Sequence, residues 1–206
     1  MSRSALKGVQ AAAGAGDDPV YVDDVFSTYV YTGVYSNTDI VNGINLSGEG
    51  GLVWTKRRNS TRSHDLCDTE RGVTKSIYTN NSDAEGTDSQ GLLAFNSNGY
   101  RIGGSTSYNN TNDNYVSWTF RKQPGFFDVV TYSGTGSAQN ISHNLGSVPG
   151  MIMVKRTSGA EDWIVYHRSL GNTSGLGLNE TNAAYTGVTA YWNATTPTDS
   201  VFTVGT

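Results

Sequence analysis

Two neighbouring stretches carry side chains that could ligate a metal or move a proton. His64 and Cys67 are a possible pair of soft ligands, but no second Cys/His pair at ligand spacing completes a zinc tetrahedron. Asp68, Glu70 and Arg71 gather two carboxylates and an arginine before a glycine. Carboxylates serve acid/base or calcium chemistry, but a local ion pair at a strand-to-loop junction is the favoured interpretation. We therefore predict structural roles for both stretches, with no metal and no cofactor.

No motif of nucleophilic or phosphate chemistry narrows the remaining choices. The three histidines and the many Ser and Thr residues always allow some Ser/His/Asp combination, and no Gly-x-Ser-x-Gly elbow selects one. The glycines at Gly171, Gly175 and Gly177 lack the Lys-Ser/Thr ending of a phosphate loop. A glycosidase needs two carboxylates about 5 to 10 Å apart across a cleft, and the sequence nominates no such pair. We predict that the protein is not an enzyme.

Two further stretches carry candidate residues, one for ligand binding and one for supporting a loop. Trp163, Tyr166 and His167 could form an aromatic and basic edge that faces a ligand, although alternation along a strand places one of each neighbouring pair in the core. His143 precedes a Pro-Gly turn, and we predict that it holds its loop by hydrogen bonding.

Composition excludes several classes of partner. The 206 residues carry a net charge of -4, and no basic run is longer than Lys56-Arg57-Arg58, which argues against nucleic acid as the main partner. We predict that this short basic run is a solvated strand end. The single Cys67 rules out an internal disulfide framework. No apolar run approaches the roughly 20 residues that span a bilayer, so we predict no membrane insertion.

The elements that must position these side chains are strands. From Asp24 onward, β-branched and aromatic residues alternate with polar ones in short runs, and the chain has 25 glycines but only four prolines. No segment shows a sustained helical period. We predict an all-β fold of short antiparallel strands in sandwich-like domains, with exposed polar loops over 78–90 and 104–114.

The strand pattern occurs twice. GLVWTKR at 51–57 returns as GMIMVKR at 150–156, and each follows a segment that begins with Asp and ends with Tyr-Thr/Ser-Gly, at 24–33 and 128–134. An aromatic-x-aliphatic-Gly motif closes both units at 98–103 and 199–205. We predict a duplicated β-domain, 23–127 and 128–206. The first unit continues into a strand at 115–121 and the second has no such sequence after Gly205, so we expect the chain to continue.

Residues 1–22 differ in composition from the rest of the chain, and we predict that they form a non-globular leader. Basic residues followed by small ones superficially resemble a signal peptide, but a hydrophobic core segment of the required length is absent. A segment of small side chains can lie closely against another protein, and a flexible leader is the alternative. A turn signal, Asp17-Asp18-Pro19, ends it.

A set of motifs over 24–206 resembles repeats in tail-fibre-like virion proteins of tailed bacteriophages, especially marine phages. They lie at 24–33, 42–54, 68–72 and 117–128 in the first unit, and at 142–146, 154–156, 163–167 and 196–205 in the second.

The resemblance implies a structural protein of the virion tail. Such a fibre would be a homotrimer whose residues 1–22 dock on a tail adaptor or nozzle protein and whose later domains meet a host cell-surface receptor. The leader residues expected to dock are Ser4, Leu6, Val9, Ala12 and Ala15. The alternatives are a carbohydrate-binding module of a tail spike or depolymerase, using Trp54, Trp118, Trp163 or Trp192, and a head decoration protein.

Overall fold

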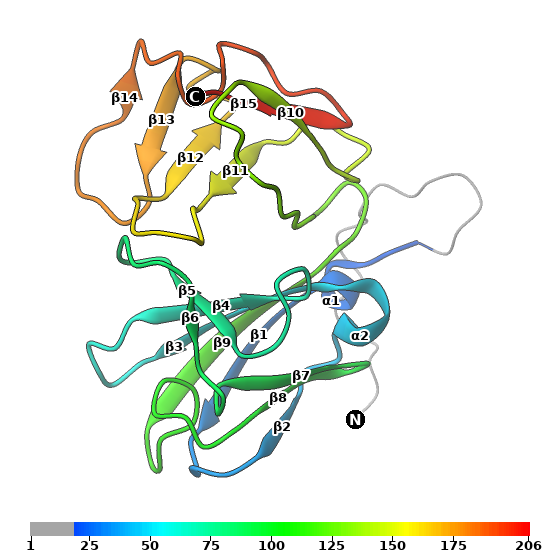
Figure 1. Cartoon of the computed structure of the whole chain (residues 1–206). Helices are drawn as coiled ribbons and strands as arrows, with labels where there is room; N and C mark the ends of the chain where they lie inside the picture. Colours follow the sequence, from blue (N-terminus) through cyan, green and yellow to red (C-terminus); the bar gives the residue numbers. More distant parts are fainter. Residues whose placement is uncertain (1–18) are drawn as a thin grey trace.

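Fifteen short strands and two helical turns make up the regular structure of residues 19–206, the part of the chain that this computed structural model describes (Figure 1). The helical turns, α1 (Val22–Val25) and α2 (Leu46–Glu49), have four residues each. All named strand pairings are antiparallel. Within the described range, no helix has the length and apolar character to cross a membrane. The predicted all-β fold is confirmed.

The first unit is a sandwich of two sheets. Its strands are β1 (Phe26–Thr32), β2 (Thr38–Val41), β3 (Gly51–Arg57), β4 (His64–Asp68), β5 (Lys75–Tyr78), β6 (Gly86–Thr87), β7 (Leu92–Asn96), β8 (Gly99–Ile102) and β9 (Asn114–Arg121). The larger sheet has the order β1-β9-β3-β4-β5-β6, and the smaller one has the order β2-β8-β7.

The second unit has the same plan with fewer strands. They are β10 (Gln139–Ser142), β11 (Met151–Val154), β12 (Ile164–His167), β13 (Ser174–Gly177), β14 (Tyr185–Thr186) and β15 (Val201–Val204). The larger sheet has the order β11-β12-β13-β14, and β10 pairs with β15 in the smaller one. Figure 1 shows this unit above the first, in yellow-green to red.

The strand pairings of the two units repeat with a constant displacement. Leu52 pairs with Asp68 across β3 and β4, and Met151 pairs with His167 across β11 and β12, so both partners are displaced by 99 residues. The same displacement relates β4–β5 to β12–β13, and β5–β6 to β13–β14. The pairing of β2 with β8 is also repeated by β10 with β15, but there the partners are displaced by 101 and 102 residues, as Thr38 to Gln139 and Ile102 to Val204 show. The predicted duplication is therefore present in the strand registers.

The repeat is incomplete at one sheet edge. In the first unit β9 lies between β3 and β1, whereas no strand of the described residues pairs with the outer edge of β11. The sequence likeness of 128–134 to 24–33 led us to expect a strand there, but 128–134 forms none. The reason is that β1 pairs only with β9, and a strand needs a partner for its backbone hydrogen bonds.

Alternation along β3 divides its side chains between two faces. Val53 is fully buried and points at the smaller sheet, where it packs in one cluster with Ile40, Tyr100 and Tyr108. In the second unit Ile152 occupies the position displaced by 99 residues and packs beside the smaller cluster of β10 and β15. Each unit therefore has its own core between its two sheets.

The segment 104–113 is not the exposed loop that its polar composition predicts. Tyr108 and Asn109 are both fully buried. The Asn109 side chain accepts from the amide of Val34 at 2.9 Å and donates to the carbonyls of Ser36 and Gly103 at 2.5 and 3.1 Å. Because these bonds replace the water that the side chain loses, a polar residue is tolerated in the core.

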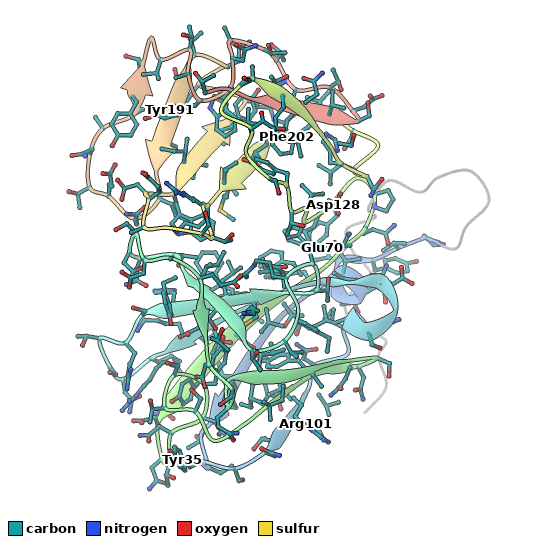
Figure 2. The ribbon with its side chains drawn as sticks, in the orientation of Figure 1. Tyr35, Glu70, Arg101, Asp128, Tyr191 and Phe202 are labelled. Carbon is teal, nitrogen blue, oxygen red and sulfur yellow. The ribbon has the colours of Figure 1, made fainter. Side chains whose placement is uncertain are left out.

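The two units pack against each other through equivalent sheet faces. Leu52 and Leu66 point away from the first unit's core, yet they are only 6% and 2% exposed, because Met153 and Trp163 of the second unit cover them. Where the chain passes from the first unit to the second, Lys122 Nζ lies 2.9 Å from a carboxylate oxygen of Glu70 and 3.3 Å from one of Asp128. Figure 2 shows Glu70 and Asp128 close together at this junction.

Candidate functional site

Trp163 lies inside the protein rather than on a ligand-facing surface. Its side chain is 3% exposed and belongs to the cluster between the two units. The indole Nε1 donates to the carbonyl oxygen of Tyr78 at 2.7 Å, which satisfies the one polar atom of the ring. Trp163 is thus the central contact of the inter-unit interface.

Tyr166 and His167 do not join Trp163 in a common binding edge. Tyr166 is 3% exposed and meets Trp192 edge-on at a centroid distance of 5.6 Å in the core of the second unit. His167 is half-buried, and its Nδ1 accepts from the amide of Ser169 at 3.3 Å. Because successive residues of a strand point to opposite faces, Tyr166 and His167 lie on different sides of β12.

His64 and Cys67 do not form a metal pair, because they lie on opposite faces of β4. His64 Nδ1 accepts from the indole of Trp54 at 3.0 Å, and burial followed by the charge of Lys56 lowers the pKa of the imidazole. Cys67 lies in the core, 3.2 Å from the hydroxyl of Tyr108, and burial raises the pKa of its thiol to about 11. Across 19–206, no three His, Cys, Asp or Glu side chains are grouped to hold a metal ion.

The predicted ion pair of the Asp68 stretch is confirmed. Arg71 Nε lies 2.7 Å from a carboxylate oxygen of Asp68, and these side chains are 7% and 3% exposed. The same guanidinium donates to the carbonyl of Leu66 at 3.0 Å and lies 3.2 Å from Glu85. A buried arginine whose Nε, Nη1 and Nη2 each donate a hydrogen bond holds the turn after β4, which is a structural role.

His143 holds a loop, as predicted. Its Nδ1 accepts from the amide of Leu145 at 3.3 Å, and its own amide donates to the carbonyl of Ser200 at 2.9 Å. The side chain is 8% exposed and stacks on Phe202 at a centroid distance of 6.4 Å.

Sequence reasoning missed the most perturbed carboxyl group of the described residues. Asp65 is 3% exposed, and burial, reinforced by the charge of Asp88, raises its pKa from 3.8 to about 7. It lies on the same face of β4 as Cys67, so the alternation of the strand could have predicted its burial. A carboxyl group in this state retains its proton close to neutral pH.

The second unit has an apolar opening beside its incomplete sheet edge. Its volume is about 200 Å3. It lies where the inner faces of β11 and β12 meet the end of β15. The residues that line it include Tyr132, Val154, Ile164, Tyr191, Trp192 and Val204. Of the regions described, this opening and the adjacent edge of β11 form the best candidate for binding, and the sequence analysis did not single them out.

The leader positions Ser4, Leu6, Val9, Ala12 and Ala15 lie outside the described residues.

Comparison with known proteins gives one match. Residues 22–206 match the family described as "Domain of unknown function (DUF7483)", and the chain therefore belongs to that family. No curated protein and no solved structure matches the chain. The matched range begins at α1 and covers both units together.

Proposed function

We propose that this chain of the DUF7483 family is a structural component of a bacteriophage virion, a tail fibre that is attached to the tail by its N-terminus and serves host attachment. The residue motifs that resemble tail-fibre-like repeats motivate the proposal. The observation that carries it is the interface between the two β-units, because a fibre needs successive domains that hold a fixed orientation to one another.

The interface joins the units by backbone bonds as well as by apolar packing. The amide of Glu85 donates to the carbonyl of Thr157 at 2.9 Å, and the amide of Glu161 donates to the carbonyl of Ser82 at 2.9 Å. Lys155 Nζ also donates to the carbonyl of Ser82, at 3.1 Å. These hydrogen bonds, together with the buried side chain of Trp163, restrict rotation of one unit against the other.

The proposal includes assembly as a homotrimer. β-domains arranged around a threefold axis bury surface that each chain alone would expose, which stabilises a fibre that cannot rely on disulfides. Residues 1–22 would dock on a tail adaptor or nozzle protein through the side chains of Ser4, Leu6, Val9, Ala12 and Ala15. Later domains would meet the host receptor.

Native mass spectrometry of the protein released from purified phage particles tests this function. Three copies of the chain in one complex, recovered from tails separated from heads, support the fibre. Recovery from heads alone would instead support a decoration protein, and a monomer that binds immobilised glycans would support a carbohydrate-binding module.

The docking role of the leader has its own test. A chain that begins at Asp23, and so lacks residues 1–22, should fold but fail to assemble onto fibreless tails, while the full chain assembles. Equal assembly of the two chains would contradict attachment through residues 1–22.

A further inference from the structure

We propose that the core of the first unit holds ordered water, bound by the hydroxyl groups of Thr55, Ser117 and Tyr100. The carboxyl group of Asp65 borders this water site. The inference goes beyond the virion role and does not depend on it. Among the described residues, six buried side-chain atoms have no hydrogen-bond partner, and these three hydroxyls are half of them. A buried hydroxyl without a partner lowers stability, so water that bonds to all three would remove that cost.

Strand pairing places two of the hydroxyls and the carboxyl group in one row across the larger sheet. Thr55 of β3 lies opposite Ser117 of β9 on one side and opposite Asp65 of β4 on the other. Directly opposed side chains of an antiparallel pair have Cβ atoms about 4.5 to 5.5 Å apart. The row faces the core, because Thr55 lies on the same face of β3 as the buried Val53.

Tyr100 reaches this row from the smaller sheet. It lies on β8, is fully buried and belongs to the same cluster as Val53. Burial raises the pKa of its hydroxyl, and the hydroxyls of Ser117 and Thr55 oppose that rise. The three hydroxyls are therefore neighbours, although none is in hydrogen-bonding geometry with another. A water molecule between them gives each one a partner, and an internal water typically makes about three hydrogen bonds.

The carboxyl group of Asp65 is the fourth polar group at the site. Burial raises its pKa to about 7, and no hydrogen bond from a described residue opposes that rise. A carboxyl group that retains its proton can donate to a water molecule. Asp65 is 3% exposed, whereas Thr55, Ser117 and Tyr100 are 0% exposed. Asp65 therefore marks the side from which water enters the site.

The second unit shows that the fold does not require polar side chains at these positions. The strand registers give the counterparts of Thr55, Asp65 and Tyr100 as Val154, Ile164 and Phe202. Valine and phenylalanine have nearly the shapes of threonine and tyrosine without the hydroxyl group. Three polar side chains thus occur together in one unit, and three apolar ones replace them together in the other. This is the pattern expected of groups that bind one shared ligand.

Oxygen-17 magnetic relaxation dispersion of the full chain tests the proposal, because it detects long-held water and does not respond to hydroxyl protons. We expect the triple variant Thr55→Val, Ser117→Ala, Tyr100→Phe to lose at least one such water relative to the parent. Thr119→Val is the matched control, because Thr119 is also fully buried on the inner face of β9, but its hydroxyl already accepts from Asn42 at 2.8 Å. The control should show the dispersion of the parent, and circular dichroism checks that both variants fold.

A high-resolution crystal structure of the full chain gives a second readout that needs no variant. We expect ordered density within hydrogen-bonding distance of all three hydroxyls. Equal dispersion in the parent and the folded triple variant would overturn the proposal. So would a direct hydrogen bond from Tyr100 to one of its two neighbours with no density between the hydroxyls. A bound monovalent cation is the competing identity of the density. It is shown if replacing sodium by choline lowers the thermal stability of the parent but not of the triple variant.

Discussion

Lys56 and Lys155 close equivalent hairpin loops with the same bonds, although 99 residues separate them. Lys56 Nζ donates to the carbonyls one and six residues further on, at 2.8 and 2.7 Å, and Lys155 Nζ does so at 3.0 and 2.8 Å. The basic run that begins at Lys56 was predicted to be a solvated strand end, and for Lys56 this prediction is wrong. Each ammonium group replaces water as the donor to its loop.

Removing either ammonium should destabilise the protein. Lys56→Met leaves three backbone carbonyls without this donor, and hydrogen bonds to charged groups contribute about 1.5 to 3 kcal/mol. We expect Lys56→Met and Lys155→Met each to lower the free energy of unfolding by about 1 to 3 kcal/mol in urea titrations. Arg58 is exposed and has no side-chain partner in the described structure, so Arg58→Met is the matched control and should change little.

Trp163 should couple the unfolding of the two units. Truncation to Trp163→Ala removes the central contact of the interface and should cost about 3 to 5 kcal/mol. We expect a single calorimetric transition of the parent chain to split into two. Trp192 is 2% exposed and buried within the second unit, so Trp192→Phe should lower the stability of that unit without separating the transitions. A single cooperative transition in Trp163→Ala would contradict the coupling role.

Asp65 should make stability fall as pH rises. Its folded-state pKa of about 7 lies above the ordinary 3.8, so the folded chain holds the proton more tightly than the unfolded chain. The resulting stability is fully present below pH 4 and is lost as pH rises through 7. The full effect is at most about 4 kcal/mol.

We expect Asp65→Asn to gain stability relative to the parent between pH 5 and pH 8, measured by urea titration at both values. Asp39→Asn is the matched control, because hydrogen bonding from Arg101 lowers the pKa of the Asp39 carboxyl from the ordinary 3.8. Asp39 is therefore ionised at both pH 5 and pH 8 in the folded and the unfolded chain, and the difference between Asp39→Asn and the parent should be the same at the two values. If the difference between Asp65→Asn and the parent is the same at pH 5 and pH 8, the proton linkage is absent.

Two of the arginine ion pairs, one buried and one exposed, should contribute very differently to the free energy of unfolding. Arg71→Met leaves the carboxylate of Asp68, which is 3% exposed, without its positively charged partner. Breaking a buried ion pair in this way costs about 3 to 5 kcal/mol. Arg101 and Asp39 are 49% and 43% exposed, so Arg101→Met should cost about 1 kcal/mol or less. Urea titration of both variants at pH 7 measures the difference, and similar losses would show that Arg71 is not needed to neutralise Asp68.

The sequence predicts the strands well because their alternation and their repetition are local signals. The run at 51–57 is strand β3 and the run at 150–156 contains strand β11, Met151–Val154, and their shared motif also predicts their equivalent positions in the sheets. The likeness of 128–134 to 24–33 misleads, since strand formation there depends on a partner that the segment itself does not encode. A segment with a strand-like sequence forms a strand only when a second segment pairs with it.

Burial is less predictable because it depends on what covers a face. Alternation places Trp163 on a face of β12, but it does not reveal that the first unit lies against that face. Polar composition likewise assigns Asn109 to solvent, although backbone groups of Val34 and Ser36, more than 70 residues away, and of the nearby Gly103 satisfy its side chain inside the core. The opening beside β11 was missed for the same reason. Whether a neighbouring strand covers that sheet edge cannot be read from the sequence of β11 itself.

The constant displacement of 99 residues from β3 to β6 has a genetic consequence. If unequal crossing-over in the gene joined any residue of β3 to β6 to the residue 99 positions later, the product would be a single hybrid unit. Each cross-strand partner among β3 to β6 in that hybrid would still meet its proper neighbour, because both copies count the same number of residues between these strands. Deletions or duplications of 99 codons within this range therefore preserve the pairing registers of β3 to β6.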